Sequence, residues 1–393
     1  MGRTIPLSLD PDSLMQTARR RTGLEDFGPF PLEEPLHLLS SAYESESRMN
    51  FVGRAAARSY LLRLLENRLR LECDRKKYPE MGQQNIPEPV FVVGLPRTGT
   101  TILYNLLELD PDNRAPLSWE VMMPSPPPGL DTTTQPDPRV AETDRLLNRV
   151  DRLAPDFKKI HPLGATLPQE CIAITTHPLQ SIQFHTTHRV PSYQSWLGRQ
   201  DLRPGYEWHK RFLQHLQWPG GGERWLLKAP AHLFGLDALF AVYPDARVIQ
   251  THRDPVKVVA SIASHGCVLR AAFSDQIDVN EIGAEWCELW AQGLESAMEY
   301  RARTGIDASR ILDLQFHEFI DDPMATVGRV YRHFGWKLSD EVEQAMRRHL
   351  QDNPRDQHGP HGYSLAQFGL DEVQVRERYA DYSDRYDVPV ESE

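Results

Sequence analysis

The 393-residue sequence contains only four cysteines, at positions 73, 171, 267 and 287, and no two of them form a C-x-x-C pair. Few and scattered cysteines favour a reduced, cytoplasmic protein over a disulfide scaffold. No apolar run approaches the ~20 residues that a membrane-spanning helix needs. The first residues also lack the apolar core of a secretory signal. We therefore expect a protein that is neither secreted nor integral to a membrane.

The sequence also lacks an excess of positive charge. Its 44 Lys and Arg face 55 Asp and Glu, which gives a formal net charge of −11. This balance argues against a protein that binds nucleic acid or an anionic membrane over its whole surface. Any site for an anion must therefore be a local cluster of cations.

One such cluster is predicted in residues 90–101, which read V-F-V-V-G-L-P-R-T-G-T-T. Four apolar residues, a tight turn and the following pattern I-L-Y-N-L-L-E-L indicate a strand, a loop and a helix. The backbone N–H groups of such a turn, with the positive N-terminus of the helix, form an anion site. The ATP and GTP form of this loop, G-x-x-x-x-G-K-[ST], uses its Lys to reach the β- and γ-phosphates. Here Thr100 replaces that Lys and Arg97 lies inside the loop, so the loop suits a phosphate better than a triphosphate tail.

A second candidate anion site follows residues 246–251, which read A-R-V-I-Q-T and predict a strand. The strand ends in His252-Arg253-Asp254-Pro255, and Ser261 lies further along the predicted helix, about 9 Å along its axis. An Arg at the strand end and a Ser on the helix can grip one phosphate without a metal. The alternative is a solvated Arg at a helix start, and the spacing alone does not decide between the two.

The fold predicted from these elements is an α/β domain built around a parallel sheet with helices on both faces. Strands are expected at 90–94, 224–228, 246–251 and 310–315, alternating with helices that include 231–243, 256–264 and 323–334. Residues 1–85 are expected to form a helical N-terminal accessory segment. Residues 86–393 would then be the main domain, with 137–217 as a helical insertion that shapes an acceptor site.

The loop and the second strand together match a known family. G-L-P-R-T-G-T-T resembles the 5′-phosphosulfate loop of sulfotransferases that use 3′-phosphoadenosine 5′-phosphosulfate (PAPS), and V-I-Q-T-H-R-D-P-V-K-V-V-A-S resembles their 3′-phosphate motif. Between them, W-L-L-K-A-P-A-H-L resembles the Lys-bearing strand of tyrosylprotein and heparan sulfotransferases. The overall pattern is most similar to bacterial sulfotransferases with an R-T-G-T-T loop, and it covers residues 88–335.

The resemblance implies a transfer of a sulfuryl group from PAPS to a hydroxyl acceptor, with no metal. The 5′-phosphosulfate would be bound by the residues of the loop, Arg97, Thr98, Gly99, Thr100 and Thr101. Arg253 and Ser261 would bind the 3′-phosphate. Sulfuryl transfer is expected to pass through a loose in-line transition state, in which catalysis is mainly positioning and electrostatic stabilisation. Arg97 and Lys228 are therefore the candidate cations for the bridging oxygen.

The base that takes the acceptor's proton has two candidates. Glu120, in L-S-W-E-V-M-M-P, is the preferred one because tyrosylprotein sulfotransferases carry a Glu base at a similar distance beyond the loop. The alternative is that Glu120 has no catalytic role and is an exposed loop residue beside a core Trp. His232 is the rival, since cytosolic sulfotransferases use the His of a K-T-H motif, but here Lys228 and His232 stand further apart.

Other features favour plainer interpretations. The pair His185 and His188, with His161, His177 and Glu170 nearby, has a spacing that a metal could use, but pocket lining is the preferred interpretation. Residues 357–364 resemble a loop that closes over the 3′-phosphate, with His358 or His361 in place of the usual cations. A P-loop small-molecule kinase and a non-catalytic nucleotide-binding scaffold are the rival functions. The sequence reveals neither the acceptor, which could be a small molecule or lipid-like, nor the oligomeric state, and no nucleic-acid partner is expected.

Overall fold

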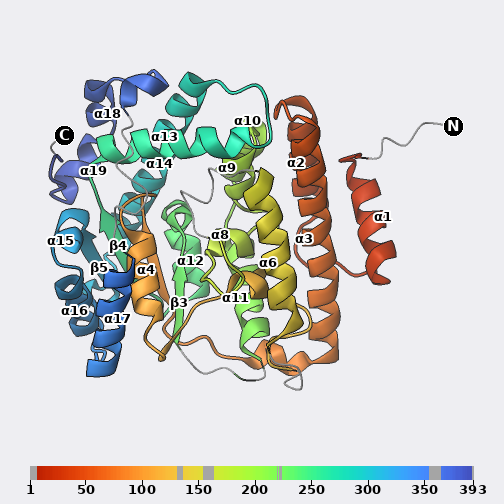
Figure 1. The fold of residues 1–393 in the computed structure, drawn as a ribbon, viewed down its shortest axis with the longest axis horizontal. Coiled ribbons are helices and arrows are strands. Elements are labelled where there is room, and N and C mark those ends of the chain that lie inside the picture. Colours follow the sequence, from red (N-terminus) through yellow and green to blue (C-terminus); the bar gives the residue numbers. More distant parts are fainter. Residues whose placement is uncertain are drawn as a thin grey trace. The chain divides into compact units, whose positions relative to one another are not determined.

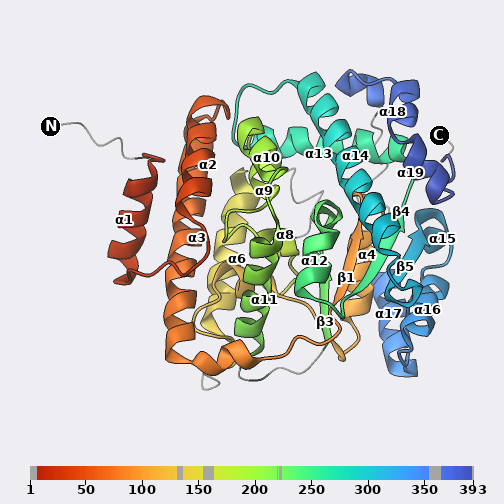
Figure 2. The same ribbon diagram turned by 180° about the vertical axis from the view of Figure 1, so that it is seen from behind.

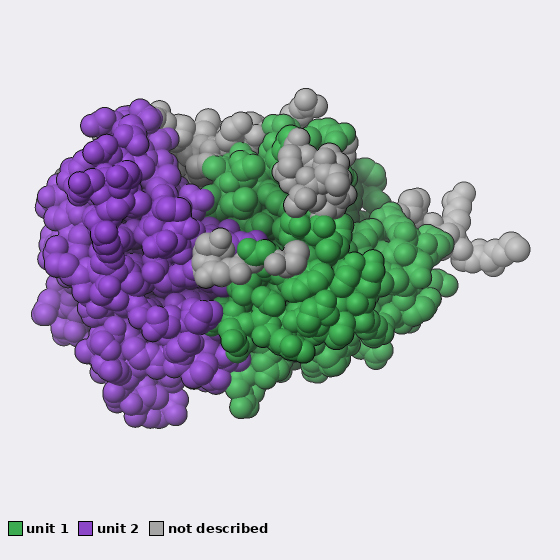
Figure 3. Space-filling model, turned by 90° about the horizontal axis from the view of Figure 1, so that it is seen from below, with its two compact units in different colours: residues 1–86, 116–222, 268–277 green, residues 87–115, 223–267, 278–393 purple. Residues whose placement is uncertain are grey.

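The computed structural model describes residues 7–130, 136–153, 163–218, 220, 224–353 and 364–391. At residues 149–153 it describes the backbone alone. Figures 1 and 2 show its ribbon from two opposite sides. Two compact units divide the chain, one of residues 1–86, 116–222 and 268–277, the other of residues 87–115, 223–267 and 278–393, coloured separately in Figure 3. We refer to them as the helical unit and the sheet unit.

The sheet unit is built on a five-stranded sheet with the order β2-β3-β1-β4-β5. The strands are β1 (Val90–Gly94), β2 (Asn113–Arg114), β3 (Arg224–Lys228), β4 (Arg247–His252) and β5 (Ile311–Gln315). Every pairing is parallel, and the register aligns Val92 with Lys228 and Gly94 with Thr251. The predicted α/β class with a parallel sheet is confirmed. Because the strands are parallel, the loop after β1, Lys228 at the end of β3 and Arg253 after β4 all lie at one edge of the sheet.

Helices cover both faces of this sheet, as Figures 1 and 2 show from opposite sides. One face packs against α4 (Thr100–Glu108), α16 (Pro323–Phe334) and α17 (Asp340–Asp352) through a continuous apolar cluster. The other face carries η2 (Pro230–Phe234), α12 (Leu236–Val242) and α14 (Val279–Thr304). The unit also contains η3 (Ala308–Arg310), α15 (Phe316–Asp321), η4 (Leu365–Phe368), α18 (Glu372–Arg378) and α19 (Ala380–Arg385).

The helical unit contains α1 (Pro11–Thr22), α2 (Glu33–Ser45), α3 (Phe51–Lys77), η1 (Pro79–Gln83), α5 (Ser118–Met122), α6 (Pro138–Leu153), α8 (Cys171–Ile174), α9 (Gln183–Thr187), α10 (Pro191–Leu197) and α11 (Arg203–Gln217). Its core joins the apolar faces of α1, α2 and α3 to side chains of α9 and α10. α13 (Pro255–Ala271) begins in the sheet unit. No helix in the described ranges is both long and apolar enough to cross a bilayer.

The predicted helix over 231–243 is wrong in one respect, because it is two helices. η2 ends at Phe234 and α12 begins at Leu236, with Gly235 between them at φ −147° and ψ 42°. Gly235 lacks a side chain and leaves the helical region at little steric cost. Its N–H bonds to the carbonyl of His232, which is the three-residue step of a 3₁₀ turn.

Candidate active site

The loop between β1 and α4 has the backbone that an anion site requires. Arg97 lies at φ +68° and Gly99 at φ +84°, and α4 begins at Thr100 immediately after them. A left-handed residue beside a helix start turns successive N–H groups toward one point, and the helix dipole adds positive potential there. Gly99 is also confined, because a Cβ there would lie 3.1 Å from the ring of Phe319.

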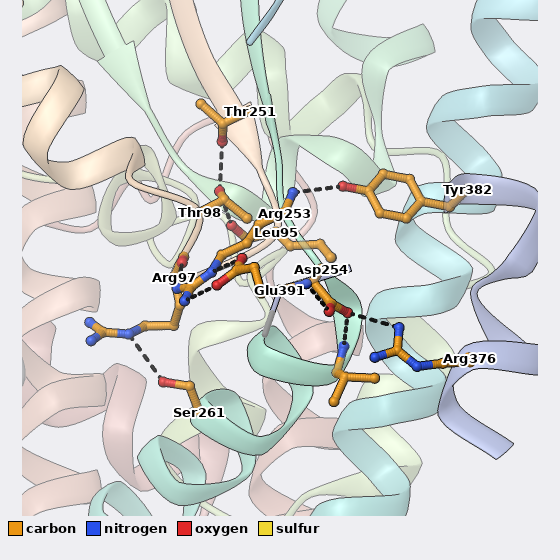
Figure 4. A network of polar contacts seen from close by, with 11 residues as sticks. Leu95, Arg97, Thr98, Thr251, Arg253, Asp254, Ser261, Arg376, Tyr382 and Glu391 are labelled. Carbon is orange, nitrogen blue, oxygen red and sulfur yellow. Dashed lines mark hydrogen bonds and ion pairs between the residues drawn. The ribbon is translucent and has the colours of Figure 1, made fainter. Parts of the chain in front are cut away.

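Thr98 fixes this loop to the neighbouring strand. Its hydroxyl lies 2.6 Å from the carbonyl oxygen of Leu95 and 2.6 Å from the hydroxyl of Thr251 on β4, as Figure 4 shows. Thr98 is fully buried and Thr251 nearly so. The side chain of Thr98 is therefore part of the support beneath the loop.

Lys228 brings an ammonium group to the start of α4. Its Nζ lies 3.1 Å from the hydroxyl of Thr101 in the first turn of α4, and its side chain is only 2% exposed. The ammonium also lies 5.9 Å from the ring centre of Tyr104. The strand β3 thus delivers its terminal Lys to the start of α4, next to the position where Thr100 replaces the expected Lys.

Arg97 connects the loop to the second predicted anion site. Its Nε donates to the hydroxyl of Ser261 at 3.2 Å, and its backbone carbonyl accepts from the guanidinium of Arg253 at 2.8 Å (Figure 4). Arg253 and Ser261, which the family resemblance assigns to one site, are thus both joined to the loop residue Arg97.

Arg253 has further partners that the sequence did not indicate. Glu391 accepts two hydrogen bonds from its guanidinium, at 2.8 and 3.0 Å, and Tyr382 accepts from its backbone N–H at 3.2 Å. The guanidinium also lies over the ring of Phe316, 4.0 Å from its centre. Glu391 is 138 residues from Arg253 in sequence, and no local pattern announces such a contact.

The two candidate bases lie in different surroundings. Glu120 belongs to the helical unit, on α5, where it is 4% exposed and its Oε2 accepts from the N–H of Leu117 at 2.9 Å. It is therefore not the exposed loop Glu of the structural alternative. His232 belongs to the sheet unit, on η2, and its ring packs edge-on against the buried ring of Phe91, with 5.0 Å between the ring centres.

Several described histidines of the helical unit are buried and engaged in packing. His188 stacks on Phe273 with 4.9 Å between the ring centres, and Arg270 donates to the carbonyl of His185 at 2.9 Å. Burial lowers the pKa of His188 and of His177 to about 4. Within the described ranges no three His, Cys, Asp or Glu gather as metal ligands. His161, His358 and His361, and residues 357–363 of the predicted closing loop, lie outside the described residues.

Comparison with known proteins identifies the family. The model of the sulfotransferase family matches residues 89–340. The chain belongs to this family. The crystal structure of the sulfotransferase STF1 from Mycobacterium tuberculosis is 36% identical, covers 95% of this chain and 98% of its own, and superposes with a TM-score of 0.83. The resemblance predicted from the sequence motifs is thus confirmed.

Two further relatives of this sulfotransferase are informative. The structure of the sulfotransferase STF9 from Mycobacterium avium is 27% identical over the whole of both chains, with a TM-score of 0.85. The curated omega-hydroxy-beta-dihydromenaquinone-9 sulfotransferase Stf3 of Mycobacterium bovis is 24% identical and is matched over 76% of this chain and 74% of its own. The sulfotransferase described here is therefore an enzyme that transfers a sulfuryl group.

Proposed function

We propose that this sulfotransferase takes its sulfuryl group from PAPS and transfers it to a hydroxyl acceptor. The observation that carries the proposal is the position of Arg97, which bonds to Ser261 through its guanidinium and to Arg253 through its carbonyl. Two adjoining anion sites suit a nucleotide that carries one charged group at its 5′ end and another on the ribose. An ATP site would instead need a cation placed for the γ-phosphate.

The loop and its neighbours would divide the donor between them. Arg97, Thr98, Gly99, Thr100 and Thr101 would hold the 5′-phosphosulfate through the loop backbone and the start of α4. Arg253 and Ser261 would hold the 3′-phosphate. Thr98 would act mainly through its bonds to Leu95 and Thr251, which keep the loop in place.

Transfer would proceed in line. The acceptor oxygen forms a bond to sulfur while the bond between sulfur and the bridging oxygen breaks, and the electron pair leaves with adenosine 3′,5′-bisphosphate. Negative charge grows on that bridging oxygen, where Lys228 and Arg97 would stabilise it. The acceptor's proton would pass to the carboxylate of Glu120, with His232 as the rival base. None of these proposed reaction steps requires a metal ion.

The acceptor is proposed to be a hydroxyl on a small or lipid-like molecule. The name of Stf3 gives that relative a hydroxylated menaquinone as its acceptor. A panel of acceptors for this enzyme should therefore begin with hydroxylated isoprenoids and continue to phenols, sterols, sugars and peptides.

Two measurements test the proposal. Calorimetry should show binding of adenosine 3′,5′-bisphosphate without added metal, and ³⁵S-labelled PAPS should label an acceptor in a metabolite extract. A purified, folded protein without affinity for adenosine 3′,5′-bisphosphate would rule out PAPS as the donor.

The base is tested by Glu120→Gln. The amide oxygen of Gln can still accept from the N–H of Leu117, so the fold of α5 should survive. Donor affinity should stay unchanged and turnover should fall by about 10²–10⁴-fold, the usual contribution of general-base catalysis. Glu142→Gln, an exposed change in the same unit, is the control and should leave turnover intact. Near-normal turnover in Glu120→Gln would transfer the role to His232.

A further inference from the structure

The guanidinium of Arg253, the proposed ligand of the 3′-phosphate, already holds an anion in this structure. Both carboxylate oxygens of Glu391 accept from it, Oε1 from Nε at 2.8 Å and Oε2 from a terminal nitrogen at 3.0 Å (Figure 4). A carboxylate and a phosphate use the same two parallel N–H groups when they bind an arginine side-on. Glu391 therefore occupies the position on Arg253 that a phosphate would need.

Glu391 is held at this position by its backbone as well as by its side chain. Its N–H donates to Oδ2 of Asp254 at 2.9 Å. Oδ1 of the same carboxylate accepts from the N–H of Val256 at 3.0 Å and lies 3.4 Å from the guanidinium of Arg376. Asp254 thus has the structural task of anchoring Glu391 next to Arg253.

The part of the chain that would have to move is short. The N–H of Val388 donates to the carbonyl of Ser383 at 2.9 Å, and Gln315 donates to the carbonyl of Tyr386 at 2.6 Å, so the chain is tied down as far as Val388. Beyond it, Val390 is 69% exposed. Residues 389–391 can leave Arg253 without disturbing α19 or the sheet.

We infer that Glu391 is a built-in competitor for the 3′-phosphate subsite, which closes the site when the donor is absent and must leave when the donor binds. The inference rests on the proposed role of Arg253. A phosphate and a carboxylate cannot share one guanidinium edge, because both anions need the same donors and repel each other. The bond from Arg253 to the carbonyl of Arg97 uses another nitrogen, so the guanidinium keeps its position while the anion is exchanged.

The expected effect on affinity follows from the strength of the pair that must open. The side chains of Arg253 and Glu391 are 21% and 24% exposed, so solvent screens the pair in part. A pair of this kind with bidentate geometry is expected to reduce the apparent affinity for a competing anion by about two- to tenfold.

Calorimetry with adenosine 3′,5′-bisphosphate tests this on Glu391→Gln and on Asp387→Asn. Glu391→Gln removes the negative charge that pairs with Arg253. The second removes an equal charge from an exposed position in the same segment, and Asn tolerates the left-handed backbone of Asp387 at φ +49°. We expect Glu391→Gln to bind about two- to tenfold more tightly than wild type, and Asp387→Asn to bind like wild type. With adenosine 5′-monophosphate, which has no 3′-phosphate, the gain should disappear.

A second measurement follows the backbone. The amide of Glu391 should exchange its hydrogen faster when adenosine 3′,5′-bisphosphate is bound, because its bond to Asp254 opens with the side chain. Unchanged or weaker binding by Glu391→Gln, an equal gain in Asp387→Asn or with adenosine 5′-monophosphate, or slower exchange would overturn the inference. If neither wild type nor Glu391→Gln binds adenosine 3′,5′-bisphosphate, the proposed donor site itself fails.

Discussion

Lys228 brings a positive charge to the start of α4 from a different element, the strand β3. The loop lacks the Lys that nucleotide triphosphatases carry beside its last Thr, and β3 brings an ammonium to Thr101 instead. The ammonium of Lys228 lies beside the start of α4. In the proposed reaction, the oxygen that bridges phosphorus and sulfur in PAPS would develop its negative charge there. A Lys at 2% exposure is costly to bury, so its position points to a task beyond solubility.

Lys228→Met tests that task. Met keeps most of the volume and removes the charge, so we expect a folded protein whose turnover falls by about 10²–10³-fold, as for loss of one transition-state donor. The affinity for PAPS, measured without acceptor, should change by less than about threefold, because the bridging oxygen gains its charge only as the bond to sulfur breaks. The exposed Lys337→Met is the control. A parallel loss of affinity and turnover would instead make Lys228 a donor-binding residue.

At this scale the sequence predicts well those partners that are close in sequence or belong to a known motif. The local pattern places Arg253 after a strand and Ser261 on the helix that follows, while their role as one site comes from the family resemblance and stays a prediction. The contact of Glu391 is not predicted, since it depends on how residues 364–391 pack against the end of β4, which no short pattern encodes. The burial of Glu120 is likewise absent from the local pattern, and its helix α5 is held by bonds from the N–H groups of Ser118 and Trp119 to carbonyls of residues 165–167, far along the chain.

Among the elements, β4 leaves no room for a side chain on β1 where β1 enters the loop. A Cβ at Gly94 would lie 2.4 Å from the hydroxyl oxygen and 2.6 Å from the carbonyl oxygen of Thr251, and Gly94 lies at φ +138°. Only glycine fits this position, because the strand backbone of Thr251 cannot retreat.

Gly94→Ala should therefore lower the free energy of unfolding by about 2–4 kcal/mol, as for an overpacked and strained core position. Gly305→Ala is the matched control, since Gly305 also has a positive φ, +53°, but nothing lies within 4 Å of an added Cβ. That change should cost about 1 kcal/mol from the backbone alone. Urea unfolding of both variants measures the difference, and equal losses would show that the contact with Thr251 can relax.

The sequence predicts those elements whose pattern is regular and local. The strands over 90–94 and 224–228 match β1 and β3, and the predicted helix over 323–334 matches α16. It misses β2, whose two residues carry no periodicity and become a strand only by pairing with Arg224 and Trp225. The apolar positions of residues 52–70 indicate a helix, but they do not indicate the polar end of α3, which continues to Lys77 without an apolar stripe.

In α3 a buried arginine holds the preceding loop. Arg68 is fully buried, and burial lowers its pKa to about 10. Its guanidinium donates to backbone carbonyls within 3.4 Å, those of Phe27, Phe30, Pro31 and His177, and lies 4.8 Å from the ring centre of Trp208. These carbonyls belong to segments with no regular structure, so Arg68 fixes their backbone.

Arg68→Lys should lower the free energy of unfolding by about 3 kcal/mol, because a point charge on a flexible stem cannot reach this spread of carbonyls and stays buried. Arg70→Lys is the control on the same helix. Arg70 is 41% exposed and pairs with Glu66 at 3.6 Å, so this change should cost less than about 0.5 kcal/mol. Chemical denaturation compares them, and equal effects would mean that the carbonyls are satisfied in other ways.

Over the whole molecule, the two units differ in what they contribute. The sheet unit contains the loop, Lys228, His232, Arg253 and Ser261, and the helical unit contains Glu120. The sequence predicts an accessory segment at 1–85 and a main domain at 86–393 with an insertion at 137–217. These boundaries remain predictions. Because the net charge is −11, binding of the proposed anionic donor would depend on the local cations at the sheet edge.

The helical unit also makes the stability of the protein depend on pH. Burial lowers the pKa of four of its histidines, to about 4 for His177, His188 and His215 and to about 3 for His209. In the unfolded chain a histidine has a pKa of about 6.5, so below that pH the unfolded chain binds protons that the folded chain does not. Stability is therefore complete above about pH 6.5 and falls as the pH drops toward 4.

One buried histidine should account for about 2 kcal/mol of this loss at pH 5, since the pKa of a histidine in the unfolded chain lies about 1.5 units above that pH. His209→Gln isolates it. The variant is less stable than wild type at pH 8 because packing is lost, but the gap should narrow by about 2 kcal/mol at pH 5, since the variant has no ring to protonate. His37→Gln is the control, because His37 is exposed. The difference in stability between this variant and wild type should be the same at both pH values. Urea unfolding at both pH values gives the gaps, and a gap for His209→Gln that does not narrow would mean that the folded unit opens to accept the proton.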